Sequence, residues 1–332
     1  MADPTGATAL SQYVPAFRAN LNLVPQVTRP RLMMAVDTDL AYDTPGDRWN
    51  ADDVGVSNPQ PVVARVPVTP NHFIDQFRRI GMFTPYADAP WLADNVDKLR
   101  EIEDPSSEMM KAVMAGLARC RDDRIIAGAL GVYYYQDNTG ALQVGPANAN
   151  VIAANDPTAQ EAENIQAVQN ATTGGYGLTV GKLINTKAFL DASELDEMDP
   201  GDKPSDYYIA VTTNQLKNLL MSIPVASNFY NDARALMNGT ISYFMGFNFI
   251  RMGSASRSNP LPKVGYTRQC FAFHRRAIQY RGRTIINARI DERPDMSYRK
   301  QAYYELDHGC LRHYDEGVIR VDCDETTNGA FT

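Results

Sequence analysis

Apolar residues recur with the period of an α-helix over one long stretch of the chain, from Asp104 to Leu130. Asp104 is suited to cap such a helix, and Pro105 fits its first position, where the missing N–H leaves no hydrogen bond unmade. Near its end the stretch is apolar nearly all round, so we expect it to pass from one packing environment into another. At about 1.5 Å per residue the helix spans about 39 Å, and we expect the rest of the chain to pack along it. Its apolar face, which includes a methionine-rich part expected in the core, consists of Met109, Met110, Val113, Met114 and Leu117.

A long hairpin is predicted upstream of this helix. Two extended runs, Leu32–Tyr42 and Pro61–Phe73, flank a polar tip, Thr44–Pro59, which is rich in turn-forming residues. Pro67 and Pro70 restrict the second run to a sheet edge or an isolated two-stranded ribbon. Because a two-stranded hairpin is marginally stable alone in water, we expect this one to lie on another subunit.

The remaining pattern predicts short helices and strands in uneven alternation. The residues before 37 contain several prolines and read as an arm that buries little by itself. Residues 136–173 are polar with little periodicity. This mixture favours an α+β fold. The predicted helices cover residues 179–190, 214–221 and 229–240, and the predicted strands cover 132–135, 207–213, 243–252 with a kink at Gly246, 270–280, 284–294, 298–306 and 318–323.

Composition narrows the functional classes. The 332-residue chain has a net charge of −7, which disfavours a broad DNA-binding face but suits a wall that encloses DNA without adhering to it. No apolar run is long enough to span a membrane, and the N-terminus lacks the features of a secretory signal. The four cysteines are widely spaced without a CxxC pair, which indicates a reducing, cytosolic setting.

Few residues of the sequence suggest a catalytic or metal-binding site. His308 and Cys310 would share one side of a strand and invite a Cys/His nucleophile interpretation, but no family signature surrounds them, and a structural cysteine near a polar histidine is the simpler alternative. The glycines at 174, 175 and 177 lack the spacing of a phosphate loop. We therefore expect no catalytic residue, no cofactor and no metal. The one conceivable metal cluster, whose spacing matches no zinc pattern, comprises Asp307, His308, Cys310, His313 and Asp315.

Charged and aromatic residues supply candidate contacts between subunits. Trp49 is expected as an exposed aromatic at the hairpin tip, where it either anchors an interface or packs locally under the loop. The charged group Asp291, Glu292, Arg293 and Asp295 lies at a predicted strand end, where it either forms ion pairs between subunits or belongs to a solvated turn. Arg275 and Arg276, together with Arg281 and Arg283, form a basic patch that contacts either packaged DNA or acidic loops of a neighbouring subunit. The candidate contact residues are Arg48, Trp49, Asp52, Asp53, Arg275, Arg276, Asp291, Glu292, Arg293 and Asp295.

The order and spacing of several segments resemble those of major capsid proteins of tailed bacteriophages with the Hong Kong 97-type fold. These segments are DKLREIEDPSS (97–107), AGLARCRDDRIIAGAL (115–130), LTVGKLINTKAFLDASELD (178–196), YYIAVTTNQLKNLL (207–220), ALMNGTISYFMGFNFIRM (235–252) and ARIDERPDMSYRKQAYYELDHGCLR (288–312). The resemblance covers roughly 86–325. It implies an N-terminal arm (1–36), an extended β-hairpin loop (37–80), a peripheral domain (81–135 and 283–325) with a spine helix (104–130), an axial domain (136–282) and a C-terminal tail (326–332).

The resemblance also implies a function. We expect a non-enzymatic major capsid protein that self-assembles into hexamers and pentamers of an icosahedral shell around double-stranded DNA. Its expected location is the virion, with assembly in the host cytoplasm. The expected partners are further copies of the chain, a separate scaffolding protein, a portal protein and a cement or decoration protein, but no membrane. The alternatives are a cellular nanocompartment shell of the same fold and a soluble Cys/His hydrolase.

Overall fold

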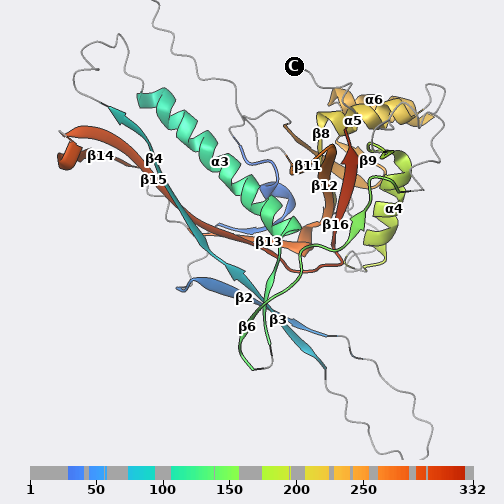
Figure 1. The fold of residues 1–332 in the computed structure, drawn as a ribbon, viewed down its shortest axis with the longest axis horizontal. Helices are drawn as coiled ribbons and strands as arrows, with labels where there is room; N and C mark the ends of the chain where they lie inside the picture. Colours follow the sequence, from blue (N-terminus) through green and yellow to red (C-terminus); the bar gives the residue numbers. More distant parts are fainter. Residues whose placement is uncertain are drawn as a thin grey trace, which may run out of the picture.

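The computed structural model describes residues 29–40, 45–55, 57, 74–93, 106–137, 139–156, 174–193, 195, 206–223, 228–239, 242–253, 261–283, 289–296 and 298–325. The predicted tail, Asp104, Pro105 and the run 61–73 lie outside these residues. Three sheets and four α-helices make up the described fold, which is α+β as predicted (Figure 1). The helices are α3 (Ser106–Leu130), α4 (Val180–Asp191), α5 (Thr213–Ser222) and α6 (Asn228–Asn238), and the short 3₁₀ turns are η1 (Met33–Ala35), η4 (Arg275–Ala277) and η5 (Pro294–Met296).

The long helix α3 lies obliquely across a five-stranded sheet (Figure 1). Val113, Leu117 and Ile125 are buried, which confirms the predicted apolar face, but Met114 is exposed and its expected place in the core is wrong. Cys120 and Gly128 of α3 contact His308 and Cys310 of the sheet. The strands of this sheet are β1 (Asp37–Asp39), β4 (Thr84–Ala93), β13 (Ile278–Gly282), β14 (Arg289–Arg293) and β15 (Arg299–Arg312).

Residues 29–36, the described part of the predicted arm, contribute to the core, contrary to the expectation of an arm that buries little. Leu32, Ala35 and Val36 are fully or almost fully buried. The backbone N–H groups of Arg31 and Leu32 donate to the Asp122 carboxylate on α3, at 3.0 and 3.1 Å. The next residues form β1, which pairs with β13 in parallel, so the chain is fixed to α3 and the five-stranded sheet before the hairpin begins.

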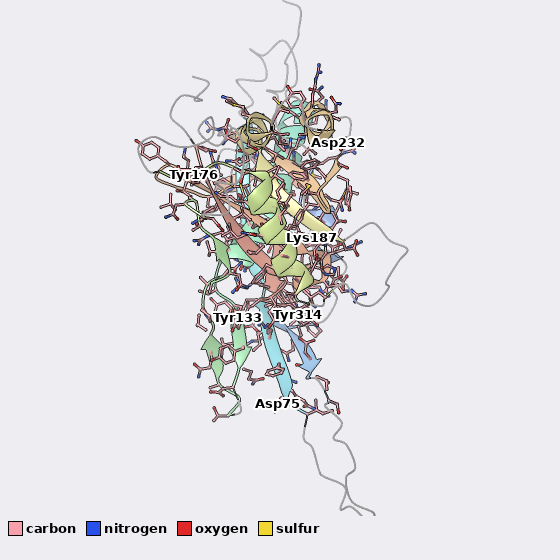
Figure 2. All side chains as sticks on the ribbon, turned by 90° about the vertical axis from the view of Figure 1, so that its right-hand side faces the viewer. Asp75, Tyr133, Tyr176, Lys187, Asp232 and Tyr314 are labelled. Atoms are coloured by element: carbon pink, nitrogen blue, oxygen red, sulfur yellow. The ribbon has the colours of Figure 1, made fainter. Side chains whose placement is uncertain are left out.

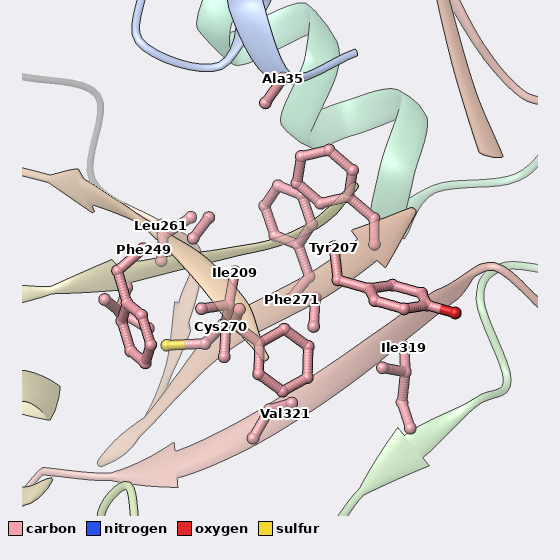
Figure 3. Close-up of a cluster of buried hydrophobic side chains, with 14 of the residues drawn as sticks. Ala35, Tyr207, Ile209, Phe249, Leu261, Cys270, Phe271, Ile319 and Val321 are labelled. Atoms are coloured by element: carbon pink, nitrogen blue, oxygen red, sulfur yellow. The ribbon is translucent and has the colours of Figure 1, made fainter. Parts of the chain in front are cut away.

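The main core lies in a seven-stranded sheet whose outer side carries α4, α5 and α6 (Figure 1). Figure 3 shows Ile209, Cys270 and Val321, which come from three neighbouring strands and share one face of this sheet, among the buried side chains of the core. Thr179 caps α4 as predicted, by accepting a hydrogen bond from the Lys182 N–H. The strands are β7 (Val151–Ile152), β8 (Tyr207–Thr212), β9 (Tyr243–Phe244), β10 (Phe247–Met252), β11 (Lys263–Val264), β12 (Thr267–His274) and β16 (Val318–Asp324).

Two predicted strands are each broken in two. The run 243–252 is a tight hairpin, β9–β10, because Met245 and Gly246 both have positive φ (52° and 85°), as a two-residue type I′ turn requires. The run 270–280 is split by η4, at which the chain leaves the seven-stranded sheet and enters the five-stranded one. Sheet membership therefore departs from the expected domain grouping: β13 lies before residue 283 but pairs with β15, and β16 lies after it but pairs with β12.

A third sheet of four strands projects from the junction of the other two (Figure 1). Its strands, in spatial order, are β2 (Arg48–Val54), β3 (Gln76–Met82), β5 (Tyr134–Gln136) and β6 (Leu142–Val144). The predicted hairpin exists, but its strands were placed wrongly: β2 occupies the predicted polar tip, and its partner is β3 rather than the run 61–73. We call this element the hairpin sheet.

Candidate functional site

Trp49 fixes the root of the hairpin sheet to the body. Its side chain is 3% exposed and packs against Phe83, with ring centroids 4.8 Å apart, beside Ala51 and Leu311. Gly309 provides room for the indole, since a Cβ there would lie 2.6 Å from the ring. The expectation of an exposed Trp49 at the hairpin tip is therefore wrong, and the local-packing alternative describes the structure. Trp49 is one of the alternate residues of β2 that are buried. The bounds of β2 could not be predicted from the sequence, because they depend on which strand pairs with it.

A network of arginines ties the same root to the end of α3. Arg79 of β3 donates to the Arg312 carbonyl and to Asp315, both at 2.9 Å, and its guanidinium lies 4.1 Å from the centre of the Tyr133 ring. Arg312 is buried and donates to the carbonyls of Ala129 (3.1 Å) and Gly131 (2.8 Å). These carbonyls lie at the negative end of the α3 dipole, so the guanidinium charge is well placed there.

The polar candidates on β2 pair within the chain. Asp53 accepts hydrogen bonds from the Tyr314 hydroxyl at 3.1 Å and contacts His313 Nε2 at 3.0 Å. Burial lowers the pKa of His313 despite the opposing effect of this carboxylate. Asp52 pairs with Arg78 at 2.6 Å and Arg48 with Asp47 at 3.1 Å, both on the exposed side. Surface pairs of this kind contribute about 0–1 kcal/mol, so they leave these side chains able to change partners.

The other charged candidates lie on separate surfaces. In the charged group at the end of β14, Arg293 pairs with Asp295 and donates to Gln301 at 3.1 Å, while Asp291 and Glu292 are exposed. The predicted basic patch divides. Arg275 and Arg276 of η4 are exposed, whereas Arg281 pairs with Asp37 and Arg283 with Asp307, each at 3.1 Å.

The residues of the suspected Cys/His site are in inert surroundings. His308 contacts the Tyr280 hydroxyl at 2.9 Å through Nδ1 and the Cys120 sulfur at 3.6 Å through Nε2, so neither ring nitrogen is left for Cys310. Burial raises the pKa of Cys310 to about 12, which keeps it a thiol at neutral pH. His308, by contrast, has a pKa lowered to about 4, by burial first and then by Arg124 and Arg121. Among the described residues no group of three or more potential ligands could hold a metal ion.

The exposed apolar side chains of the hairpin sheet were missed in the sequence. Phe77 is 59% exposed, Val54 71% and Val144 62%, and Tyr135 and Leu142 are also exposed. Among the described residues, the sheet contacts the body at its root through β3 and β15, and Figure 2 shows Asp75 near the other end of the sheet, well away from Tyr133 and Tyr314. The tyrosines at 134–135 indicated a strand, which is β5. The polar residues after 136 gave no indication that β5 pairs with β3 and β6.

Comparisons with known proteins agree with this architecture. No described helix is long and apolar enough to cross a membrane, and no curated protein matches the sequence. The solved structures that resemble the chain are phage capsids. The Cyanophage Pam1 capsid is 13% identical with a TM-score of 0.65, covering 98% of this chain and 100% of its own. The capsid of Ralstonia phage GP4 is 13% identical with a TM-score of 0.60, covering 94% and 96%.

The sequence profile of the phage capsid protein family matches residues 9–325, which is nearly the whole chain. The long helix across a sheet, the projecting hairpin sheet and the separate seven-stranded sheet are consistent with the Hong Kong 97-type fold of such proteins. The chain belongs to the phage capsid protein family, and it is a major capsid protein with a structural role in the phage shell.

Proposed function

We propose that this protein encloses a double-stranded DNA genome in an icosahedral shell of hexamers and pentamers, with the hairpin sheet of each subunit lying on a neighbour. The exposed apolar side chains of the hairpin sheet carry this proposal. The register places Phe77 and Tyr135 on one face of the sheet and Val54, Leu142 and Val144 on the other, so both faces present apolar side chains. Exposed apolar surface of this kind marks interaction sites in soluble proteins. Burial of apolar area stabilises a contact by about 25 cal/mol per Å², so Phe77, Val54 and Val144 favour association with a second copy.

The fold suggests which part of the subunit serves as each domain of the shell protein. The five-stranded sheet with α3 corresponds to the peripheral domain, and the seven-stranded sheet with α4 to α6 corresponds to the axial domain around the symmetry axes. The charged group of Asp291, Glu292, Arg293 and Asp295, together with Arg275 and Arg276, would then meet other subunits on surfaces distinct from the hairpin sheet. Shells of this kind need heterologous contacts that close by symmetry.

The proposed partners follow from the same role. A separate scaffolding protein would guide assembly in the host cytoplasm, a portal protein would occupy one vertex, and a cement or decoration protein would bind outside. The net charge of −7 supports a wall that does not adhere to its DNA. The role requires no catalysis, which fits the high pKa of Cys310.

Substitution of Phe77 tests the hairpin contact. We expect Phe77→Asp to leave the melting temperature of the unassembled subunit unchanged, because the side chain is exposed, but to abolish particles in electron micrographs of coexpressed capsid and scaffold. Phe77→Leu should assemble normally, since it restores an apolar side chain. Normal particles from a Phe77→Asp, Val144→Asp double variant would rule out docking through this sheet.

A further inference from the structure

Two arginines of α3 are half-buried without an acidic partner. Arg121 and Arg124 are one turn apart, and the Nε of each is shielded from solvent and lacks a hydrogen-bond partner. Arg124 donates from Nη2 to the Met82 carbonyl at 3.3 Å, a long contact. Within the described part of the chain no carboxylate pairs with either guanidinium. Removing a charge from water without pairing it is unfavourable, so the arrangement is incomplete in the isolated subunit.

Arg124 lines a cavity of about 350 Å³ at the root of the hairpin sheet. The cavity lies between α3, β3, β5 and β15, and its lining also includes Arg312 and the apolar side chains of Ile80, Met82, Val132 and Leu311. A carboxylate entering it would meet a guanidinium in surroundings that strengthen the attraction between opposite charges. The low pKa of His308, to which both Arg124 and Arg121 contribute after burial, indicates a positive potential in this region.

The described acidic residues closest to Arg124 in the chain or the sheet either have partners or face another surface. Asp307 pairs with Arg283, and Asp315 pairs with both Arg79 and Arg312. Asp122 accepts backbone N–H groups on a different side of α3. Asp123 lines a separate groove beside Pro262 and Gln269. In the part of the chain that the structure describes, these nearby carboxylates are therefore either paired or turned toward another surface, and none pairs with Arg124.

Asp75 is an unpaired carboxylate at the far end of the hairpin sheet (Figure 2). Its carbonyl accepts from the Gly55 N–H at 2.8 Å, while its side chain is exposed and has no partner among the described residues. Ile74 and Phe77 beside it are exposed as well. Asp75 lies five residues before Ile80 of the cavity wall, about 17 Å along an extended strand, so it is too far away to enter its own cavity.

We propose that Asp75 of one subunit enters the cavity of a neighbouring copy and pairs there with Arg124, with Arg121 adding to the positive charge. Ile74 and Phe77 would cover the apolar walls. This inference rests on the proposed docking of the hairpin sheet and names the residues that determine where it docks. The match combines opposite charge with adjacent apolar surface on both sides, whereas the phosphates of packaged DNA would supply charge alone.

A charge exchange between the two positions tests the pair. Asp75→Lys and Arg124→Glu should each raise the subunit concentration needed for assembly by about tenfold or more, and the double variant should return it to within about threefold of the unmodified protein. Arg234→Glu, on an exposed α6 arginine, is the matched control and should have no effect. Melting curves of the unassembled subunits identify any variant that does not fold.

Other outcomes would overturn the pair. If the double variant is as defective as the sum of the single ones, Asp75 does not meet Arg124, although hairpin docking stands if Phe77→Asp still abolishes particles. If Arg124→Glu assembles normally but its particles hold less DNA, phosphate is the occupant instead. If either charge reversal fails to fold, the neutral cycle of Asp75→Asn with Arg124→Gln replaces it. Coupling between those two substitutions would then support the pair, and additivity would exclude it.

Discussion

Replacement of Trp49 by alanine should release the hairpin sheet while leaving the rest of the subunit folded. The indole belongs to a small apolar cluster with Ala51, Phe83 and Leu311, which is separate from the main core of the seven-stranded sheet. Truncation of a buried tryptophan to alanine destabilises by about 3–5 kcal/mol, because the lost transfer energy is added to that of the cavity left behind. Since the main core is untouched, the loss should appear as local opening of β2 and β3.

Amide hydrogen exchange on the unassembled subunit measures this opening. At about 1.4 kcal/mol per tenfold, this destabilisation corresponds to exchange that is about 10²- to several-10³-fold faster in peptides from β2 and β3. Phe77→Ala, an exposed aromatic of the same sheet, is the control and should shift stability by less than about 0.5 kcal/mol. Unchanged exchange in the Trp49→Ala hairpin, or equal acceleration in Phe77→Ala, would contradict the assignment of Trp49 as the anchor. So would an equal loss of protection across β8, β12 and β16.

Four further experiments address other parts of the subunit. Gly309→Ala should destabilise by about 1–3 kcal/mol in urea unfolding, because its Cβ would lie 2.3 Å from the Met82 carbonyl oxygen, whereas Gly282→Ala meets only ordinary contacts and should be neutral. Burial raises the pKa of Glu325, but hydrogen bonds from Arg268, Lys263 and Gln215 outweigh it and lower the pKa to about 2. The stabilisation is therefore present above pH 4.5 and lost as pH falls toward 2, and Glu325→Gln should flatten this part of the acid unfolding curve. Cys310 should react with a thiol reagent only after unfolding, and Cys310→Ala should assemble normally; fast labelling of Cys310 in the native subunit would revive the nucleophile interpretation. Arg293→Glu should reduce particle yield more than it lowers the melting temperature, because the residue is on the surface, and equal losses would indicate a role within the subunit.

Local signals predicted the helices well. The three- and four-residue spacing of apolar residues over 104–130 predicted α3. Thr179 correctly indicated the start of α4, and Gly239 correctly indicated the end of α6. These signals are encoded in neighbouring residues, so no knowledge of distant partners is needed. Gly239 has φ of 83°, the left-handed conformation that favours glycine after a helix.

Pairing between distant strands was the part that the sequence did not reveal. The polar run around Asp52 looked like a loop, yet it is β2, because its register depends on β3 more than 20 residues later. The register places Trp49 and Phe77 on the same face of the hairpin sheet. Trp49 is buried because it lies at the root against Phe83 and Leu311, whereas Phe77 lies farther along the sheet and is exposed. The unpaired state of Arg124 likewise depends on contacts from β3 and on where every nearby carboxylate finds its partner.

The chain passes between its two larger sheets twice at nearly the same place. One crossing runs from β12 through η4 into β13, and the other runs from β15 into β16. The two are joined by hydrogen bonds from His313 N to the Ala277 carbonyl (2.8 Å) and from His274 N to the Gly317 carbonyl (2.9 Å). Tension between neighbouring subunits would thus be carried along two covalent strands laid side by side. In an assembled shell this joint would then resist internal pressure through two paired backbone segments as well as through side-chain packing.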